Sequence, residues 1–359
     1  MKKTVLFEWH KGKGQMVPFG GYLMPVVYSS IKNESIAVRT YCGVFDVSHM
    51  GKIKIGGERF LEFGNCIFPM DVKNAKDYKA LYGYLLNEDG GIIDDLIVYK
   101  FPSYLLCVVN ASNTRKVLNK LQSLQDNGIE IEDRTDSYSM IAIQGPYAKA
   151  CLYTIINTEL SLKKFCCMEF ENDEYAFIIA RTGYTGEDGY EIIVENKYIE
   201  KLWLKIFDSD RKVIPCGLGA RDVLRLEAGY PLYGHELSEN ITPLHVGGER
   251  FIDFNKDFIG KKNLLNLKEK ISRLLGSFVL NGKHIARQND KIYYNGKLIG
   301  EITSGTYSFN FNKSIALGFV DKEYLDKKMD KVVIKHKKDS SEAIILTTSC
   351  LQYYRNLKN

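Results

Sequence analysis

Along the first half of the chain, helical segments are interspersed with apolar runs that are typical of β-strands. Runs of this kind cover residues 52–55, 96–100, 104–109, 138–143 and 175–180. Residues 114–125 and 198–207 repeat their apolar positions with a helical period instead and predict two amphipathic helices. Asn113 or Thr114 is a candidate cap for the first of these helices. Strands interspersed with helices in this way predict an α+β fold.

The pattern changes after a lysine-rich stretch with few apolar residues at 261–270, which is typical of a connecting helix or a linker. From Leu274 onward, short strand-like runs are separated by turn pairs at residues 281–282, 295–296 and 304–305. Helical periodicity is almost absent until Asp321. We therefore predict a separate all-β domain here, in which the charged run at residues 327–338 forms a solvated strand face.

Two adjacent carboxylates stand out in the segment NEDGGIIDDLIVY at residues 87–99. Gly90 and Gly91 favour a tight turn, and the apolar residues that follow predict a strand. Because successive strand side chains point to opposite faces, we expect Asp94 and Asp95 to diverge, one into water and the other into a pocket. A buried ionised carboxylate needs partners, which makes that aspartate a candidate catalytic base or cation anchor. The alternative is that the pair only completes a hairpin turn.

A second candidate site is the loop RTGYTGEDGYE at residues 181–191, which follows a predicted strand. Its aromatic and acidic residues suit a flat nitrogen heterocycle that donates hydrogen bonds, with Tyr184 and Glu191 as the candidates. The alternative is an ordinary long hairpin.

A third candidate is the segment GLGARDVLRLE at residues 217–227, which predicts a loop that opens a helix. Arg221 and Arg225 are four residues apart and share one helical face, where one or both can bind an anion. The alternative is a pair of surface salt bridges with Asp222 and Glu227.

Length and composition are those of an ordinary globular protein. The 359 residues predict two or three domains, and the chain is 45% hydrophobic and 26% charged. No apolar run is long enough to span a bilayer, so no membrane association is expected. The N-terminal residues resemble neither a secretory signal nor a transit peptide. We expect a cytoplasmic protein, although a trimmed form from the mitochondrial matrix would look the same.

Charge, cysteines and histidines narrow the choice of partners. A net charge of +5 is weak support for an acidic partner and poor support for nucleic-acid binding. The eight cysteines include no CxxC pair and are typical of reduced core residues. The six histidines form no HxH or HExxH arrangement, so we expect no metal site. We interpret His49 as a structural histidine with its hydrogen bonds satisfied.

The chain resembles the glycine cleavage system T-protein family, the aminomethyltransferases, over essentially its whole length. The resemblance is carried in order by the segments FEWHKGKGQMVPFGGYLMPVVYSS, AVRTYCGVFDVSHMG, LLNEDGGIIDDLIVY, VVNASN, RTGYTGEDGYEI, CGLGARDVLRLEAGYPLYGHEL, DFIGKK and GEITSGTYS. It implies a three-domain cloverleaf-like arrangement around a folate pocket. Residues 1–50 with 138–260 then form a discontinuous folate-binding domain, residues 51–137 a second domain that carries Asp95, and residues 271–359 the C-terminal β-barrel.

The resemblance also implies an activity and its site. Family members move an aminomethyl group from the dihydrolipoyl arm of the H-protein to tetrahydrofolate, which gives 5,10-methylenetetrahydrofolate and ammonia. Lipoylated H-protein and tetrahydrofolate are thus the implied partners, with tetrahydrofolate as acceptor substrate. The essential aspartate of the family falls on Asp95, which would orient N5 of the folate and stabilise the positive charge that develops there. The implied pocket residues are Met50, Tyr82, Ile97, Asn110, Tyr184, Glu191 and Arg221.

Departures from the family pattern are concentrated at residues 242–250, which read TPLHVGGER where the family usually has TPLEAGLGW. His245 thereby replaces a glutamate and Arg250 replaces a tryptophan near the folate, while Tyr22 replaces another tryptophan. The altered segment is the only support for one alternative, a demethylase or methyltransferase of the same fold that moves a methyl group to tetrahydrofolate. A second alternative is a non-catalytic folate-binding protein, against which the retention of Asp95 argues.

Overall fold

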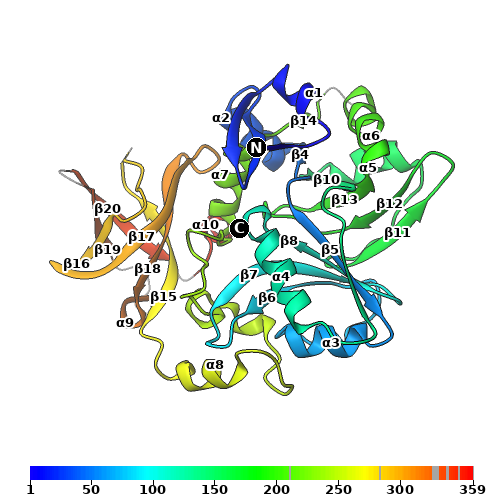
Figure 1. The fold of residues 1–359 in the computed structure, drawn as a ribbon. Helices are drawn as coiled ribbons and strands as arrows, with labels where there is room; N and C mark the ends of the chain where they lie inside the picture. The colour runs from blue at the N-terminus through cyan, green and yellow to red at the C-terminus, as the bar shows by residue number, and fades with distance from the viewer. Residues whose placement is uncertain (210–211, 283, 326–330, 337–338, 347, 359) are drawn as a thin grey trace.

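The computed structural model describes residues 1–209, 212–282, 284–325, 331–336, 339–346 and 348–358. Two large sheets lie against each other, with helices on their outer faces, and a β-barrel stands beside them (Figure 1). A three-stranded sheet near the N-terminus has the order β1-β3-β2. Its strands are β1 (Lys2–Lys3), β2 (Gln15–Phe19) and β3 (Tyr22–Val27).

The first large sheet has six strands in the order β11-β12-β13-β10-β4-β14. Its strands are β4 (Gly43–Asp46), β10 (Tyr138–Gln144), β11 (Cys167–Glu171), β12 (Ala176–Ala180), β13 (Gly189–Glu195) and β14 (Ile214–Pro215). The second has five strands, all antiparallel, in the order β6-β7-β8-β5-β9. They are β5 (Gly51–Gly57), β6 (Ala80–Leu86), β7 (Ile92–Lys100), β8 (Leu105–Val109) and β9 (Ile129–Asp133).

The period of two along these strands explains why the sheets form layers. In β7, Leu96 and Val98 belong to the core shared with α3 (Phe60–Ile67) and α4 (Thr114–Leu124). Ile97 and Tyr99, on the opposite face, pack toward the six-stranded sheet. Both faces are therefore buried, in the order helices, sheet, sheet, helices.

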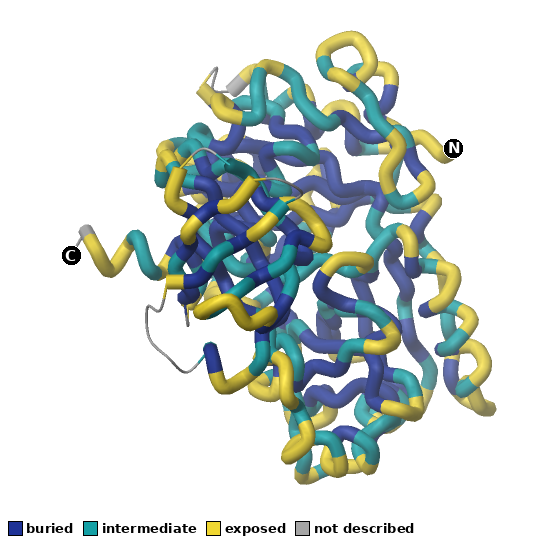
Figure 2. Tube along the Cα trace, turned by 90° about the vertical axis from the view of Figure 1, so that its left-hand side faces the viewer, coloured by how far each residue is buried: buried dark blue, intermediate teal, exposed yellow. Residues whose placement is uncertain are grey.

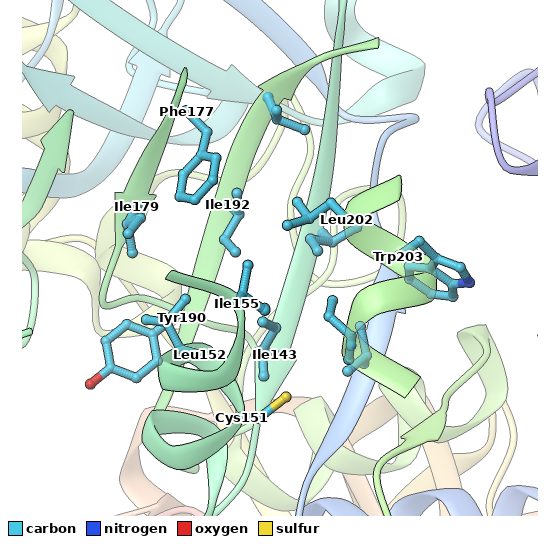
Figure 3. Packing of buried hydrophobic residues seen from close by; sticks show 14 of the residues in the cluster. Ile143, Cys151, Leu152, Ile155, Phe177, Ile179, Tyr190, Ile192, Leu202 and Trp203 are labelled. Atoms are coloured by element: carbon cyan, nitrogen blue, oxygen red, sulfur yellow. The ribbon is translucent and has the colours of Figure 1, made fainter. Parts of the chain in front are cut away.

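The outer face of the six-stranded sheet is covered by α5 (Ala148–Ile156) and α6 (Asn196–Ser209). Figure 3 shows Leu152 and Ile155 of α5 and Leu202 of α6 beside the strands. Burying a side chain of this size contributes about 1.5–3 kcal/mol relative to leaving it exposed. The tube in Figure 2 shows that buried segments fill the interior, while loops at the periphery are exposed.

The C-terminal part is a closed barrel with the strand order β15-β18-β17-β16-β19-β20. Its strands are β15 (Arg273–Leu280), β16 (Lys291–Tyr294), β17 (Lys297–Ser308), β18 (Lys313–Asp321), β19 (Lys331–His336) and β20 (Asp339–Leu346). Helix α7 (Leu218–Ala228) runs between the barrel and the N-terminal part of the chain, in contact with β17 and β3 (Figure 1).

The remaining helices connect these parts. They are α1 (Phe7–Lys11), α2 (Ile31–Thr40), α8 (Lys261–Lys268), α9 (Lys322–Leu325) and α10 (Cys350–Lys358), with 3₁₀ turns η1 (Ala111–Asn113), η2 (Pro243–Val246) and η3 (Gly248–Phe251). No described helix combines the length and the apolar character needed to cross a membrane.

The predicted α+β fold with a C-terminal barrel is confirmed, and the five predicted strands and two predicted helices of the first half are present. The stretch at 261–270 is mostly helix α8, and 295–296 is a turn. The charged run at 327–338 lies partly outside the described residues, and the part described is β19. The domain boundaries stay a prediction.

Two local predictions are wrong. Residues 304–305 lie inside strand β17, paired with β18, and form no turn. The glycine at 305 serves a close approach instead, since a Cβ there would lie 2.2 Å from the Ala286 carbonyl oxygen. Asn113 does precede α4, but its side chain makes no capping hydrogen bond. Its carboxamide is instead bonded to Asp94.

Candidate functional site

A cavity of about 290 Å³ lies between the two large sheets and is closed on other sides by residues 229–233 and 246–251. Strand alternation aims odd-numbered residues of β7 into it, since these face the six-stranded sheet. The cavity brings together all eight residues named above as site candidates, which are Met50, Tyr82, Asp95, Ile97, Asn110, Tyr184, Glu191 and Arg221. Their roles in binding and catalysis stay predictions.

Asp95 lies in strand β7 with its carboxylate at the cavity wall. Its Oδ1 accepts a hydrogen bond from Asn110 Nδ2 at 2.8 Å, and its Oδ2 accepts one from the Tyr82 hydroxyl at 3.2 Å. Burial raises the pKa of Asp95, because the low-dielectric surroundings disfavour the ionised form. The Tyr82 hydroxyl thus helps to hold the carboxylate.

The expectation that one aspartate of the pair stays in water is wrong. Asp94 is fully buried on the opposite face of β7, where the segment that leads into α4 covers it. The hairpin-turn alternative is wrong as well, because the turn is made by residues 87–91, where the Asn87 N–H donates to the Gly91 carbonyl. Both carboxylates therefore belong to the strand, and each has specific partners.

Glu191 forms the acidic end of the cavity. It lies in β13, is buried, and accepts a hydrogen bond from the Thr182 hydroxyl at 2.5 Å. Burial raises its pKa, and Arg221 opposes that shift. The loop at 181–188 does connect two strands as a hairpin, but it also places Thr182 and Tyr184 in the cavity.

Arg221 points into the molecule from the first turn of α7. Its Cζ lies 4.9 Å from the centre of the Tyr184 ring, a cation–π distance, and its buried Nη1 has no hydrogen-bond partner among the described residues. Asp222 pairs with Arg225 instead, and Arg225 is itself only 2% exposed. The salt-bridge alternative is therefore wrong for Arg221 and right in part for Arg225, which pairs with Asp222 but is buried. Arg221 keeps an unused buried donor at the cavity.

His49 also lines the cavity, and the interpretation of it as a fully satisfied histidine is wrong. It is buried against the rings of Phe19 and Tyr22, and its Nδ1 has no partner among the described residues. Burial lowers the pKa of His49 to about 3, so its imidazole is neutral near pH 7.

Several cavity residues were missed from the sequence. They include six aromatic residues: Phe19, Tyr84, Phe165, Tyr230, Tyr233 and Phe251. Tyr84 could have been predicted, because it is two residues from Tyr82 and therefore on the same face of β6, directly opposite Asp95 in the β6–β7 hairpin. Phe19 ends strand β2 and Phe251 ends the 3₁₀ turn η3, while Phe165, Tyr230 and Tyr233 come from connecting segments, whose paths no periodicity predicts. The described residues contain no group of three or more His, Cys, Asp or Glu side chains able to hold a metal ion.

Family models match almost the entire chain. The GCVT N-terminal domain matches residues 6–256, and the glycine cleavage T-protein C-terminal barrel domain matches residues 273–350. The chain belongs to the glycine cleavage T-protein family.

Individual relatives agree with this assignment. The chain is 44% identical over 330 residues to the aminomethyltransferase of Thermotoga petrophila, with 90% of each chain covered. It is 40% identical over 350 residues to that of Thermosipho melanesiensis, with 96% of each covered. A crystal structure of the glycine cleavage system aminomethyltransferase T from Bartonella henselae superposes with a TM-score of 0.90 at 29% identity, covering 96% of both chains.

Of the departures from the T-protein pattern at residues 242–250, the one at His245 is a helix cap. Thr242 precedes the 3₁₀ turn η2, and its backbone N–H donates to His245 Nδ1 at 3.1 Å. This is a capping box, in which the third residue is usually Glu or Gln, so the histidine does the work of the family's glutamate. His245 does not line the cavity.

Arg250 does lie at the cavity, so this departure changes the site. Its guanidinium Cζ is 4.7 Å from the centre of the Phe251 ring. The same residue lines an adjoining cavity of about 340 Å³, which shares Tyr82, Phe165 and Phe251 with the first. A cation therefore stands where the two cavities meet, in place of an aromatic face.

Proposed function

We propose that the cavity around Asp95 binds tetrahydrofolate, and that the chain acts there as the aminomethyltransferase of the glycine cleavage system. The donor is the S-aminomethyl-dihydrolipoyl arm of the H-protein. The C–S and C–NH₂ bonds of the donor break, and two C–N bonds form to N5 and N10 of the folate. The two N–H protons of the folate leave with the products, one on the lipoyl thiol and one on ammonia.

The observation that carries the proposal is the setting of Asp95. Its carboxylate is held by two neutral donors, Asn110 and Tyr82, and no cation among the described residues pairs with it. A buried carboxylate of this kind stabilises positive charge strongly, because the low dielectric strengthens the attraction. A folate nitrogen that attacks the aminomethyl carbon becomes positively charged, which is the charge Asp95 would offset.

The rest of the cavity suits the pterin and its substituents. Glu191 can accept hydrogen bonds from the amino and ring N–H groups of a pterin, a charge-assisted interaction. The unused Nη1 of Arg221 can donate to the folate carbonyl or to its anionic tail. Tyr184, Ile97 and Met50 supply aromatic and apolar walls.

The alternative of a demethylase or methyltransferase loses much of its support, because His245 is a helix cap and only Arg250 alters the cavity. A lipoylated H-protein remains the proposed partner, and a net charge of +5 would speed its encounter if its surface is acidic. We also propose a cytoplasmic location, which is supported by the bacterial source of the relatives.

The deciding experiment measures tetrahydrofolate-dependent ammonia release from aminomethylated H-protein. Equal amounts of ammonia and methylenetetrahydrofolate are expected from the wild type. Asp95→Asn is expected to lower turnover at least a hundredfold while the fold is kept, as followed by circular dichroism. Asp89→Asn is the matched control, since it removes a carboxylate exposed in the turn of the same hairpin. Full turnover in Asp95→Asn, or folate binding by the wild type without ammonia release, would contradict the proposal.

A further inference from the structure

Behind the proposed catalytic aspartate lies a second buried carboxylate, Asp94, which does not touch the cavity. Its Oδ1 accepts hydrogen bonds from Asn110 Nδ2 at 2.8 Å and Asn113 Nδ2 at 2.6 Å. Its Oδ2 accepts one from the backbone N–H of Asn110 at 2.9 Å. Three donors thus converge on a side chain that the reaction itself does not use.

Two of these three donors belong to Asn110, the residue that also holds Asp95. The Asn110 carboxamide nitrogen lies 2.8 Å from Asp94 Oδ1 and 2.8 Å from Asp95 Oδ1. A carboxamide has two N–H bonds, so one can be directed to each carboxylate. Because Asp94 accepts hydrogen bonds from both the backbone and the side chain of Asn110, it fixes the direction of the N–H bond that reaches Asp95.

We propose that Asp94 is a positioning residue, which orients Asp95 for the aminomethyl transfer through the shared Asn110 carboxamide. The inference rests on the proposed function of Asp95. It adds a residue that contacts no substrate and lies on the far face of the same strand. The arrangement depends on the alternation of side chains along β7. Asp94 and Asp95 are adjacent and point to opposite faces, and both reach Asn110, which follows the last residue of β8.

The sequence of the covering segment fits this role better than a purely structural one. Asn113 stands at the start of α4, where an asparagine side chain ordinarily caps the helix. Here it makes no cap, and its carboxamide is bonded to Asp94 instead. The segment therefore gives up a stabilising hydrogen bond within the helix and uses the donor to fix the carboxylate.

The charged and titratable groups that face Asp94 are few. Asp95 lies on its own strand, and its charge together with burial raises the pKa of Asp94. From the segment at 229–233, Tyr233 is influenced by Asp94, and its hydroxyl accepts a hydrogen bond from Lys116 of α4 at 3.2 Å. The covering segment itself contributes only the neutral Asn110 and Asn113. Asn110 therefore links two carboxyl groups that repel each other when both are ionised.

The test compares Asp94→Asn with wild type in the complete reaction with H-protein. An asparagine at this position must turn an N–H₂ group toward one of the three donors, which displaces Asn110. We expect kcat to fall at least tenfold while KM for tetrahydrofolate changes less than threefold.

Two further variants keep the test decisive. Asn113→Ala removes one donor to Asp94 without touching the cavity and is expected to lower kcat two- to fivefold, which tests the inference if Asp94→Asn fails to fold. Asp89→Asn is the exposed control and is expected to match wild type. Unchanged kcat in both Asp94→Asn and Asn113→Ala, or a loss that appears only as a higher KM for tetrahydrofolate, would overturn the inference. Failure of the proposed function is distinguishable, because the wild type would then release no ammonia.

Discussion

Glu236 holds a buried ion pair at the junction of the barrel with the rest of the chain, and removing it should be costly. Its Oε2 accepts hydrogen bonds from Arg225 Nη1 at 3.0 Å and from the Leu232 N–H at 2.9 Å. Its Oε1 accepts one from the Ser304 hydroxyl of β17 at 2.6 Å. Glu236 is fully buried, and Arg225 is 2% exposed. The perturbation to make is Glu236→Ala.

The expected cost follows from what the alanine leaves behind. Breaking a buried pair by removing one partner costs about 3–5 kcal/mol, because an uncompensated charge remains. Arg225 keeps its bond to Asp222 at 2.9 Å, which softens this loss. The Leu232 N–H and the Ser304 hydroxyl each lose an acceptor, at about 1–3 kcal/mol when no water replaces it. We therefore expect the free energy of unfolding to fall by about 4 kcal/mol.

The same variant should weaken folate binding. The Tyr230 carbonyl accepts a bond from Arg225 at 3.3 Å, and the Pro231 carbonyl accepts one from the Tyr184 hydroxyl. Residues 229–233 form one side of the cavity, so loosening Arg225 should raise the dissociation constant of tetrahydrofolate several-fold.

Urea unfolding followed by circular dichroism and by tryptophan fluorescence measures the stability. Both tryptophans, Trp9 and Trp203, lie outside the barrel, so a difference between the two probes would report separate unfolding of the barrel. The control is the combined variant Arg225→Met, Glu236→Met, Ser304→Ala, which removes the charges and the hydroxyl together and should recover at least half of the loss. A loss below about 1 kcal/mol in Glu236→Ala, or a combined variant no more stable than it, would refute the reasoning.

Two further predictions concern the departures at 245 and 250. Burial lowers the pKa of His245, so the stability from its cap is present above the ordinary histidine pKa and is lost as the pH falls through the lower folded value. Thermal melts between pH 5 and 7 should therefore show a smaller decrease of Tm for His245→Gln than for wild type. Parallel decreases in the two proteins would count against this. Arg250→Trp should tighten tetrahydrofolate several-fold by restoring an aromatic face, as measured by titration calorimetry; an unchanged dissociation constant would show that this face is not used.

Strand periodicity was enough to predict which way the site aspartates point, but not what covers them. Alternation along β7 correctly separated Asp94 from Asp95. The burial of Asp94 depends on Asn110 and Asn113, and the direction of their carboxamides is set by tertiary contacts that a local capping preference cannot reveal. That the eight candidate residues lie in one cavity was predicted only by the family resemblance, because they come from six separate segments of the chain.

Arginines show the same limit in the third candidate segment. The helical spacing of Arg221 and Arg225 was correct, yet both lie inside the molecule because the barrel and residues 229–236 cover α7. Spacing predicts that two residues share a helical face, whereas the burial of that face depends on which distant segment packs on it.

Alternation along β7 also limits how this part of the sequence can change in length during evolution. Deleting one residue between Gly91 and Asp94 would exchange the two faces of the whole strand, so that an aliphatic side chain would replace the carboxylate in the cavity. Gly91 fixes the start of this count, because a Cβ there would lie 1.8 Å from the Glu239 carbonyl oxygen and the strand cannot slide past that point. Insertions and deletions should therefore be excluded from Gly91 to Asp95, whereas they can accumulate at the exposed residues 172–174 between β11 and β12, which do not line the cavity.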